Sequence, residues 1–285
     1  MIKALLAIYA IWGFNWVVMK EANVFFPPVT FAFLRFFSGA VILLVINFFL
    51  HLPIPPKRYW PWIAVTGILQ IAFNNTAAQV GMTTLGAGMA AVLDYSMPVW
   101  LAIMAHFILK ERLTKRKVLG IVLSMAGLCL LLNVDLSGAN LFGMLLTLAG
   151  AVGWAAAGII VKIQDRHMES KDCNMIQYTT WQMVAGALAL GLYTCFYGFG
   201  TIHWTPLAAL CLGYNGLLAS ALAFFLWNIV LTHLEAAKAG VAILAVPAVG
   251  VLSGIVVLGE ALTLHSALGM LLILAGILCI VVQKK

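Results

Sequence analysis

The stretch Glu111-Arg112-Leu113-Thr114 recurs 149 residues later as Glu260-Ala261-Leu262-Thr263. The same offset relates further pairs on either side of it: Pro98 with Pro247, Gly120 with Gly269, and Gly127 with Gly276. Self-similarity at a fixed spacing indicates an internal repeat. The stretch therefore divides the chain into two related halves, which we place at residues 1–137 and 138–285.

The repeat extends toward the start of each half at slightly shorter offsets. Trp12-x7-Lys20 matches Trp154-x7-Lys162 at an offset of 142 residues. The segment that runs from Arg35 to Gly39 aligns with residues 182–186 at an offset of 147, and there Gln182 stands in place of Arg35. Any charged site built on this arginine is therefore expected in one half only.

The composition places most of this chain in lipid. Hydrophobic residues make up 64% of the 285 residues and charged residues only 9%, and the mean hydropathy is +1.07. Soluble domains carry about 25% charged residues, because water must wet their surface. A soluble enzyme, a nucleic-acid-binding protein and a disordered chain are therefore excluded. The five cysteines show no metal-ligand or CxxC spacing, so we expect no disulfide framework and no metal site.

Runs of about 20 apolar residues predict membrane-spanning helices. The predicted spans are 3–22, 29–50, 60–82, 87–108, 118–134, 141–162, 174–197, 207–232, 239–258 and 264–283. We therefore expect an all-α integral membrane protein with ten transmembrane helices. Five spans in each repeat is an odd number, so the second repeat must enter the membrane inverted. Inverted repeats are typical of alternating-access transporters.

The basic residues predict the orientation. With a cytoplasmic N-terminus, fourteen of the sixteen lysines and arginines fall on the cytoplasmic side, Lys162 among them. Lys20 lies on the outer side and Arg35 lies within a span. Cytoplasmic loops are enriched in Lys and Arg. We therefore expect both termini in the cytoplasm and a multi-pass protein of the cell membrane. A cleaved signal peptide is a minor alternative for the first span, which lacks a cleavage-site pattern.

Several features occur together in this chain: ten spans, the five-plus-five repeat, Trp12-Gly13 in the first span, Arg35 in the second, and the repeated Pro, Glu-x-Leu-Thr and Gly pattern. In this combination the sequence resembles the EamA-type branch of the drug/metabolite transporter superfamily. The resemblance covers nearly the whole chain. It implies export of amino acids, related metabolites or drugs across the inner membrane of a bacterium, without specifying the solute. It departs at Gln182, where the first half has Arg35.

Two ionisable side chains lie well inside the predicted spans, Arg35 and Asp94. At the helical rise, both lie roughly 9–10 Å below the outer edge of their spans, and Asn15 and Asn75 lie at about the same depth. Ionisable groups at membrane depth are costly and mark functional sites by default. One interpretation is an Arg35–Asp94 ion pair, with the asparagines as interhelical hydrogen bonds. The other is a solute site, in which Arg35 binds a carboxylate and Asp94 binds an amine or takes up a proton.

Aromatic and proline residues complete the predicted site. Several aromatic residues are expected to line its walls together with Gln182, although a Trp or Tyr can equally belong to an interfacial belt: Trp12, Tyr95, Trp154 and Trp181. Pro98 and Pro247 interrupt the fourth and ninth spans, and we expect hinges there, with packing kinks as the alternative.

The function expected from these patterns is secondary transport, most simply export of small amphipathic metabolites by alternating access. A lipid-linked substrate flippase is one alternative. An intramembrane enzyme is a weaker alternative, because HExxH, GxGD and GxSxG motifs are absent. We expect no cofactor, with proton coupling left open. The expected partners are a small-molecule substrate and the lipid bilayer, with no nucleic acid. A monomer is plausible, since each repeat supplies an interface to the other.

Overall fold

The computed structural model describes residues 1–85, 87–132, 140–169, 172–259 and 261–281. Within these ranges every element of regular structure is helical, which confirms the all-α class. The elements are α1 (Ile2–Ala22), α2 (Pro28–Phe49), η1 (Lys57–Tyr59), α3 (Trp60–Gly67), η2 (Ile68–Phe73), α4 (Asn74–Leu85), α5 (Ala87–Asp94), α6 (Met97–Ile108), α7 (Lys115–Leu131), α8 (Leu141–His167), α9 (Met175–Tyr197), α10 (Pro206–Tyr214), η3 (Asn215–Leu222), α11 (Ala223–His233), α12 (Ala236–Ile243), α13 (Ala245–Leu258) and α14 (Leu264–Val281).

Local sequence explains where several of these helices begin. The Asn174 side chain accepts a hydrogen bond from the backbone N–H of Gln177, and the Gln177 side chain accepts one from the backbone N–H of Asn174. This reciprocal pair is a capping box at the start of α9. Asn140 caps α8 in a similar way, and Pro28 occupies the first turn of α2, where its missing N–H is tolerated.

Six helical stretches in the described part of the chain are long and apolar enough to cross a membrane: residues 2–22, 28–49, 89–108, 141–167, 206–233 and 236–257. Large apolar side chains also point away from the bundle: Phe196 is 91% exposed, Val256 82% and Phe48 76%. Only a lipid environment accommodates so much outward apolar surface. The chain is a multi-pass membrane protein.

Two of the helical stretches contain a π-helical segment. Elements α3, η2 and α4 follow one another without a gap, and so do α10, η3 and α11. Single-turn π segments inside α-helices locally widen the backbone and are frequent at functional sites. Both segments begin beside a glycine that contacts another helix. Gly67 faces Gly186 of α9, and Gly216 faces Gly39 of α2.

Two other helical stretches break one turn before a proline. Helix α5 ends at Asp94, four residues before Pro98, and α6 begins at Met97, so the break lies at Tyr95–Ser96. Helix α12 ends at Ile243 and α13 begins at Ala245, two residues before Pro247. A proline lacks the N–H that would bond the carbonyl four residues earlier, which explains both positions.

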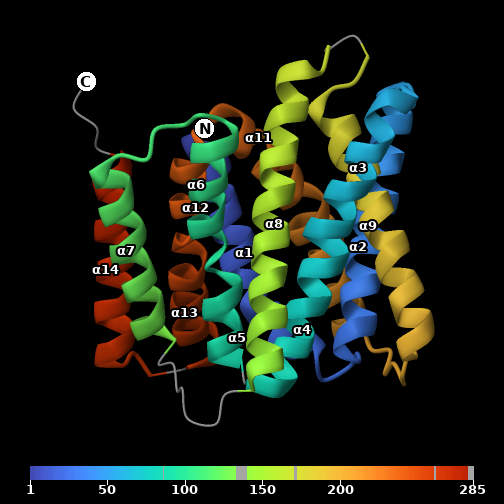
Figure 1. Cartoon of the computed structure of the whole chain (residues 1–285). Coiled ribbons are helices and arrows are strands. Elements are labelled where there is room, and N and C mark those ends of the chain that lie inside the picture. Colours follow the sequence, from blue (N-terminus) through green and yellow to red (C-terminus); the bar gives the residue numbers. More distant parts are fainter. Residues whose placement is uncertain (86, 133–139, 170–171, 260, 282–285) are drawn as a thin grey trace.

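Glycines allow α7 and α14 to pack closely along their length, at one side of the bundle (Figure 1). A Cβ on Gly127 would lie 2.7 Å from the carbonyl oxygen of Gly269, and one on Gly120 would lie 2.7 Å from that of Gly276. Each contact is with backbone, which cannot rotate away as a side chain can. The interface therefore depends on glycine at these positions.

We expect Gly127→Ala to lower the thermal stability of the detergent-purified protein, because overpacking of a tight helix contact costs about 1–3 kcal/mol. The matched control is Gly213→Ala in α10, where an added Cβ meets no atom within 4 Å. There the better helix propensity of alanine should raise stability by up to about 1 kcal/mol. Differential scanning fluorimetry measures both, and equal shifts in the two variants would contradict the packing argument.

Candidate functional site

A cavity of about 450 Å³ lies between helices of both halves of the chain. Its wall is built from α1, α2, η2, α4 and α5 of the first half and from α8, η3, α11 and α13 of the second. The lining reaches Lys20, Asn23 and Pro28, where α1 connects to α2. The cavity therefore extends toward that end of the bundle. Its volume falls in the range of sites that bind small molecules.

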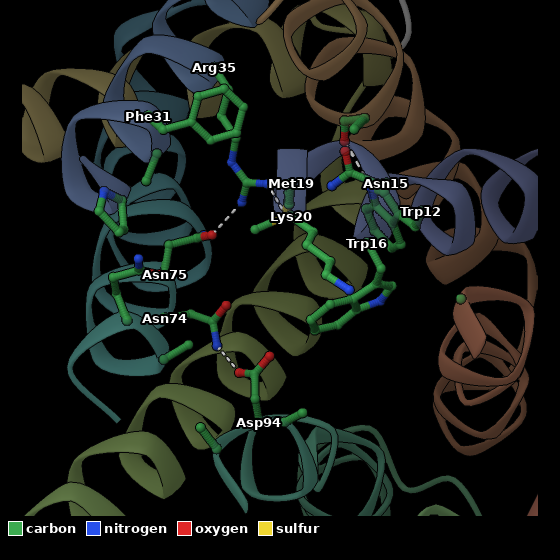
Figure 2. A pocket seen from close by; sticks show the side chains of 18 of the residues that line it. Trp12, Asn15, Trp16, Met19, Lys20, Phe31, Arg35, Asn74, Asn75 and Asp94 are labelled. Carbon is green, nitrogen blue, oxygen red and sulfur yellow. Dashed lines mark hydrogen bonds between the residues drawn. The ribbon is translucent and has the colours of Figure 1, made fainter. Parts of the chain in front are cut away.

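Seven of the nine predicted binding residues line this cavity: Trp12, Asn15, Arg35, Asn75, Asp94, Tyr95 and Trp154. Figure 2 shows five of them in the close-up, with Arg35 and Asp94 on opposite sides of the space. The rise per residue predicted a common layer for Arg35, Asp94, Asn15 and Asn75, and all four line the cavity. Their contact with a solute stays a prediction.

Arg35 is held by groups from two neighbouring helices. Its Nη2 donates a hydrogen bond to Asn75 Oδ1 at 2.6 Å, and its Nη1 lies 3.5 Å from Met19 Sδ (Figure 2). The guanidinium also lies 4.5 Å from the centroid of the Phe36 ring, a cation–π contact. The buried Nε has no hydrogen-bond partner among the described residues. The guanidinium is thus oriented by its surroundings but only partly satisfied.

Asp94 has a different partner from Arg35. Its Oδ1 accepts a hydrogen bond from Asn74 Nδ2 at 2.6 Å (Figure 2). The neighbouring residues Asn74 and Asn75 thus serve the two charges separately. No ion pair joins Arg35 to Asp94, although both residues are described. The interpretation of these residues as a simple ion pair does not match this arrangement, and both charged groups face the cavity instead.

Aromatic side chains line the inner wall of the cavity. Trp12 donates its Nε1–H to the backbone oxygen of Ala219 at 2.8 Å and meets Trp154 edge-on, with ring centroids 6.4 Å apart. The rings of Trp16 and Tyr95 form a second pair at 6.4 Å. These contacts fix four rings that line the cavity. An apolar body with a charged end fits such a wall.

Two buried polar atoms beside the aromatic wall lack a partner within the described chain. They are Asn15 Oδ1 and Trp154 Nε1. Asn15 itself is 6% exposed. Buried polar groups are nearly always hydrogen-bonded, so each exception requires an explanation. Both residues line the cavity, and neither polar atom is satisfied by the described chain itself.

Gln182 and Trp181, the other two predicted residues, lie outside this cavity. Helices α2 and α9 run in opposite directions (Figure 1), so a residue seven positions after the start of α9 lies near the other end of the bundle from Arg35. Gln182 donates to Gln70 Oε1 at 2.8 Å, and Gln70 lines the cavity. Gln182 thus contacts the cavity only through Gln70. Trp181 stacks on Trp60 beside a separate apolar groove.

Of the two predicted hinge prolines, Pro98 packs against α12. An added Cβ on Gly240 of α12 would lie 3.1 Å from the Cα of Pro98, so α6 and α12 pack tightly there. Pro247 follows the break between α12 and α13. A helix is therefore interrupted shortly before each of the two prolines. Motion about them stays a prediction.

A cluster of charges at the opposite end of the bundle from Lys20 was not predicted. Lys162, expected in a cytoplasmic loop, is only 5% exposed within α8. Its Nζ lies 3.3 Å from Glu111 Oε1 and donates to the backbone oxygens of Leu231 and Leu234. The Trp-x7-Lys repeat was a signal that singled out Lys162. Sequence alone could not show that the lysine faces the protein rather than water.

A second ion pair lies near this cluster, between Lys117 and Glu235. Lys117 Nζ lies 2.9 Å from Glu235 Oε2, and Lys238 Nζ lies 3.3 Å from the same atom. The hydrogen bond from Lys117 holds the pKa of Glu235 below its ordinary value, and the charges of Lys117 and Lys238 act in the same direction. The ion pair ties the start of α7 to the start of α12.

We expect this pair to give stability that is present above the ordinary glutamate pKa and lost as the pH falls through the lowered pKa of the folded state. Glu235→Gln should therefore melt slightly below the wild type at pH 7, and the difference should shrink below about pH 4. The effect is expected to be small, because the Glu235 carboxylate is about half exposed to solvent and solvent-screened ion pairs contribute about 0–1 kcal/mol. A difference in melting temperature that grew on acidification would contradict the assignment.

Comparison with known proteins identifies relatives that are named as transporters. The chain is 32% identical to the uncharacterized transporter YoaV of Bacillus subtilis, over 97% of this chain and 96% of that protein. It is 29% identical to a probable amino-acid metabolite efflux pump of Salmonella typhimurium, over 95% and 91% of the two chains. A solved crystal structure superposes with a TM-score of 0.84 at 18% identity, covering 98% of this chain and 95% of that one, which supports the fold.

A family model also matches nearly the full length. It is described as the EamA-like transporter family and matches twice, at residues 1–133 and 141–282. With this match, the family suggested by the sequence pattern is confirmed, and the protein is a transporter rather than an enzyme. The chain belongs to the EamA-like transporter family.

Proposed function

We propose that this protein is a secondary transporter that exports small amphipathic metabolites bearing a carboxylate and an amine, with amino acids as the simplest examples. The observation that carries this proposal is the placement of Arg35 and Asp94 on opposite sides of one cavity, each held by its own asparagine. A guanidinium binds carboxylates through its fork of N–H donors, and a carboxylate attracts an ammonium group. The aromatic wall between them suits an apolar side chain.

The names of two relatives favour the same solute class. The proteins of Salmonella typhimurium and Escherichia coli that match over 95% of this chain are both described as probable amino-acid metabolite efflux pumps. Their identity to this chain is 29% and 28%. This likeness supports export as the direction and amino-acid metabolites as the first solutes to test.

The proposed architecture is ten membrane-spanning helices in two inverted repeats, 1–137 and 138–285. Two observations support it. The family model matches once in each repeat. Glycines that correspond across the repeats also pair in space: Gly120 faces Gly276 and Gly127 faces Gly269, so exchanging the repeats converts one pair into the other. Inverted repeats supply the two alternative packings that alternating access requires.

The proposed location is the bacterial inner membrane, with both termini in the cytoplasm. The distribution of lysine and arginine supports this orientation. Figure 1 shows that the start of α1 and the end of α14 lie at one end of the bundle, and the connection from α1 to α2 lies at the other. In this orientation the cavity extends toward the outside. The structure then has the outward-facing conformation, from which an exporter releases its solute.

Reconstitution into proteoliposomes tests the proposal. The panel contains radiolabelled amino acids, cationic drugs and a lipid-linked sugar, each with and without an imposed pH gradient. We expect flux of at least one amino acid above that of empty liposomes, and a dependence on the pH gradient would assign proton coupling as well. Flux of the lipid-linked sugar alone would replace the proposal with a flippase. Absence of flux for every solute, in protein that elutes as a single folded species, would overturn it.

A further inference from the structure

The buried charge cluster around Lys162 has the composition of an anion-binding site. The Lys162 ammonium group is buried and is surrounded by three oxygen atoms, one from the carboxylate of Glu111 and two from the backbone of Leu231 and Leu234. The carbonyls orient the ammonium group, and Glu111 supplies the negative charge near it. A buried lysine whose ion-pair partner is one carboxylate, here that of Glu111, can exchange that carboxylate for another anion.

Glu111 also connects two short helices that close this end of the bundle. It follows α6, and its Oε2 accepts a hydrogen bond from the backbone N–H of Ala236, the first residue of α12, at 2.7 Å. Helices α6 and α12 pack on each other and are separated from α5 and α13 by the breaks described above. Through Glu111, Lys162 of α8 therefore holds both half-helices in place.

The repeat relates Lys162 to a residue that already faces the cavity. In Trp12-x7-Lys20 and Trp154-x7-Lys162 the two lysines occupy the same place, one in each half. Lys20 lines the cavity toward the α1–α2 connection (Figure 2), whereas Lys162 lies near the other end, covered by Glu111. When the two halves exchange conformations, Lys162 becomes a lining residue of an inward-facing cavity, as Lys20 is of the present one, whatever partners either lysine keeps.

We propose that Lys162 binds the carboxylate of the solute in the inward-facing state, and that Glu111 occupies this position while the inner end is closed. This inference rests on the proposed function, which supplies the carboxylate-bearing solute and the alternating access. Separating Lys162 from Glu111 without a replacement would leave a buried charge unpaired, which is strongly unfavourable. A solute carboxylate keeps the lysine paired while Glu111 releases α6 and α12. Opening of the inner end is thus coupled to loading.

Accessibility of a cysteine in α12 measures this opening. Ala239 is fully buried, so Ala239→Cys, in a variant whose five native cysteines are replaced by alanine, reports on the packing of α12. The rate of maleimide labelling is followed in proteoliposomes with no solute, with leucine, and with leucinamide, which keeps the amine but has lost the carboxylate. We expect leucine to accelerate labelling roughly fivefold or more, as is usual for coupled sites, and leucinamide to have no effect.

Glu111→Gln should accelerate labelling without any solute, because an amide pairs weakly with Lys162 yet still accepts from Ala236. Glu169→Gln, on an exposed glutamate, is the matched control and should leave the rate unchanged. Lys162→Met combined with Glu111→Gln removes both charges together and should label equally fast with leucine and without it. Lys162→Arg keeps the cation and should retain part of the leucine effect.

The outcomes separate this inference from the proposed function. Leucine flux in the wild type, combined with a labelling rate that Glu111→Gln does not change, would overturn the role of the pair and leave the transporter intact. Equal acceleration by leucine and leucinamide would overturn carboxylate binding at Lys162. Failure of every amino acid in the flux panel would overturn the proposed function itself.

Discussion

Arg35→Met is expected to raise the KM for leucine flux by roughly ten- to hundredfold while the protein stays folded. Arg35 lines the cavity, and its one hydrogen bond to Asn75 leaves donors of the guanidinium for a solute carboxylate. A hydrogen bond to a charged group contributes about 1.5–3 kcal/mol, and about 1.4 kcal/mol corresponds to a tenfold change in affinity. Methionine keeps the length and apolar character of the side chain, so the packing against Phe36 should largely survive. Proteoliposome uptake over a range of leucine concentrations gives the KM.

The matched control is Arg58→Met. Arg58 is an exposed arginine that pairs with Asp172, and its guanidinium contacts the Tyr59 ring. Its loss should leave the KM within about twofold of wild type, because exposed ion pairs contribute little. Arg35→Lys should give an intermediate KM, since an ammonium group keeps the charge but loses the planar fork. An unchanged KM in Arg35→Met would contradict carboxylate binding by Arg35.

The rarity of charge made Arg35 and Asp94 predictable from the sequence. In a chain with 9% charged residues, two ionisable side chains inside apolar spans stand out, and the helical rise places them at a common depth. Depth does not specify rotation about the helix axis. The division of Asn74 and Asn75 between the two charges depends on that rotation, on the π segment before them and on the packing of α4. These could not be predicted from the sequence.

The direction of α9 explains why Gln182 lies outside the cavity. Its equivalence to Arg35 in the repeat is a relation between sequences, whereas α2 and α9 cross the bundle in opposite directions (Figure 1). The residue equivalent to Arg35 therefore lies at the mirrored depth. There the Gln182 side chain donates a hydrogen bond to Gln70. The charge distribution already assigns Lys162 to the cytoplasmic side and Lys20 to the outer side, which agrees with this mirrored relation. In the proposed inverted repeats, equivalent residues are expected to lie toward opposite ends of the bundle.

Asp94→Asn is expected to remove the preference of the transporter for solutes that carry an amine. The Asp94 carboxylate lines the cavity and uses one oxygen to accept from Asn74. Asparagine keeps the shape and that acceptor but has no charge for an ammonium group. Wild type should prefer leucine over 4-methylpentanoate, its analogue without the amine, by roughly tenfold or more, because a charge-assisted hydrogen bond contributes about 1.5–3 kcal/mol. Competition of each compound against radiolabelled leucine gives the ratio.

In the Asp94→Asn variant the ratio should fall to about one, through weaker inhibition by unlabelled leucine rather than stronger inhibition by the analogue. Arg35 and Asp94 have separate hydrogen-bond partners, so Arg35→Met and Asp94→Asn should act independently. The free-energy effects of the two substitutions should therefore add in the double variant within about 0.5 kcal/mol, as is usual for sites without shared partners. Asp172→Asn, on the exposed partner of Arg58, is the control and should keep the wild-type preference. If Asp94→Asn still discriminated between leucine and 4-methylpentanoate, the amine would have to bind elsewhere in the cavity. The aromatic faces of Trp12 and Trp154 would then be the groups to test, because they also attract cations.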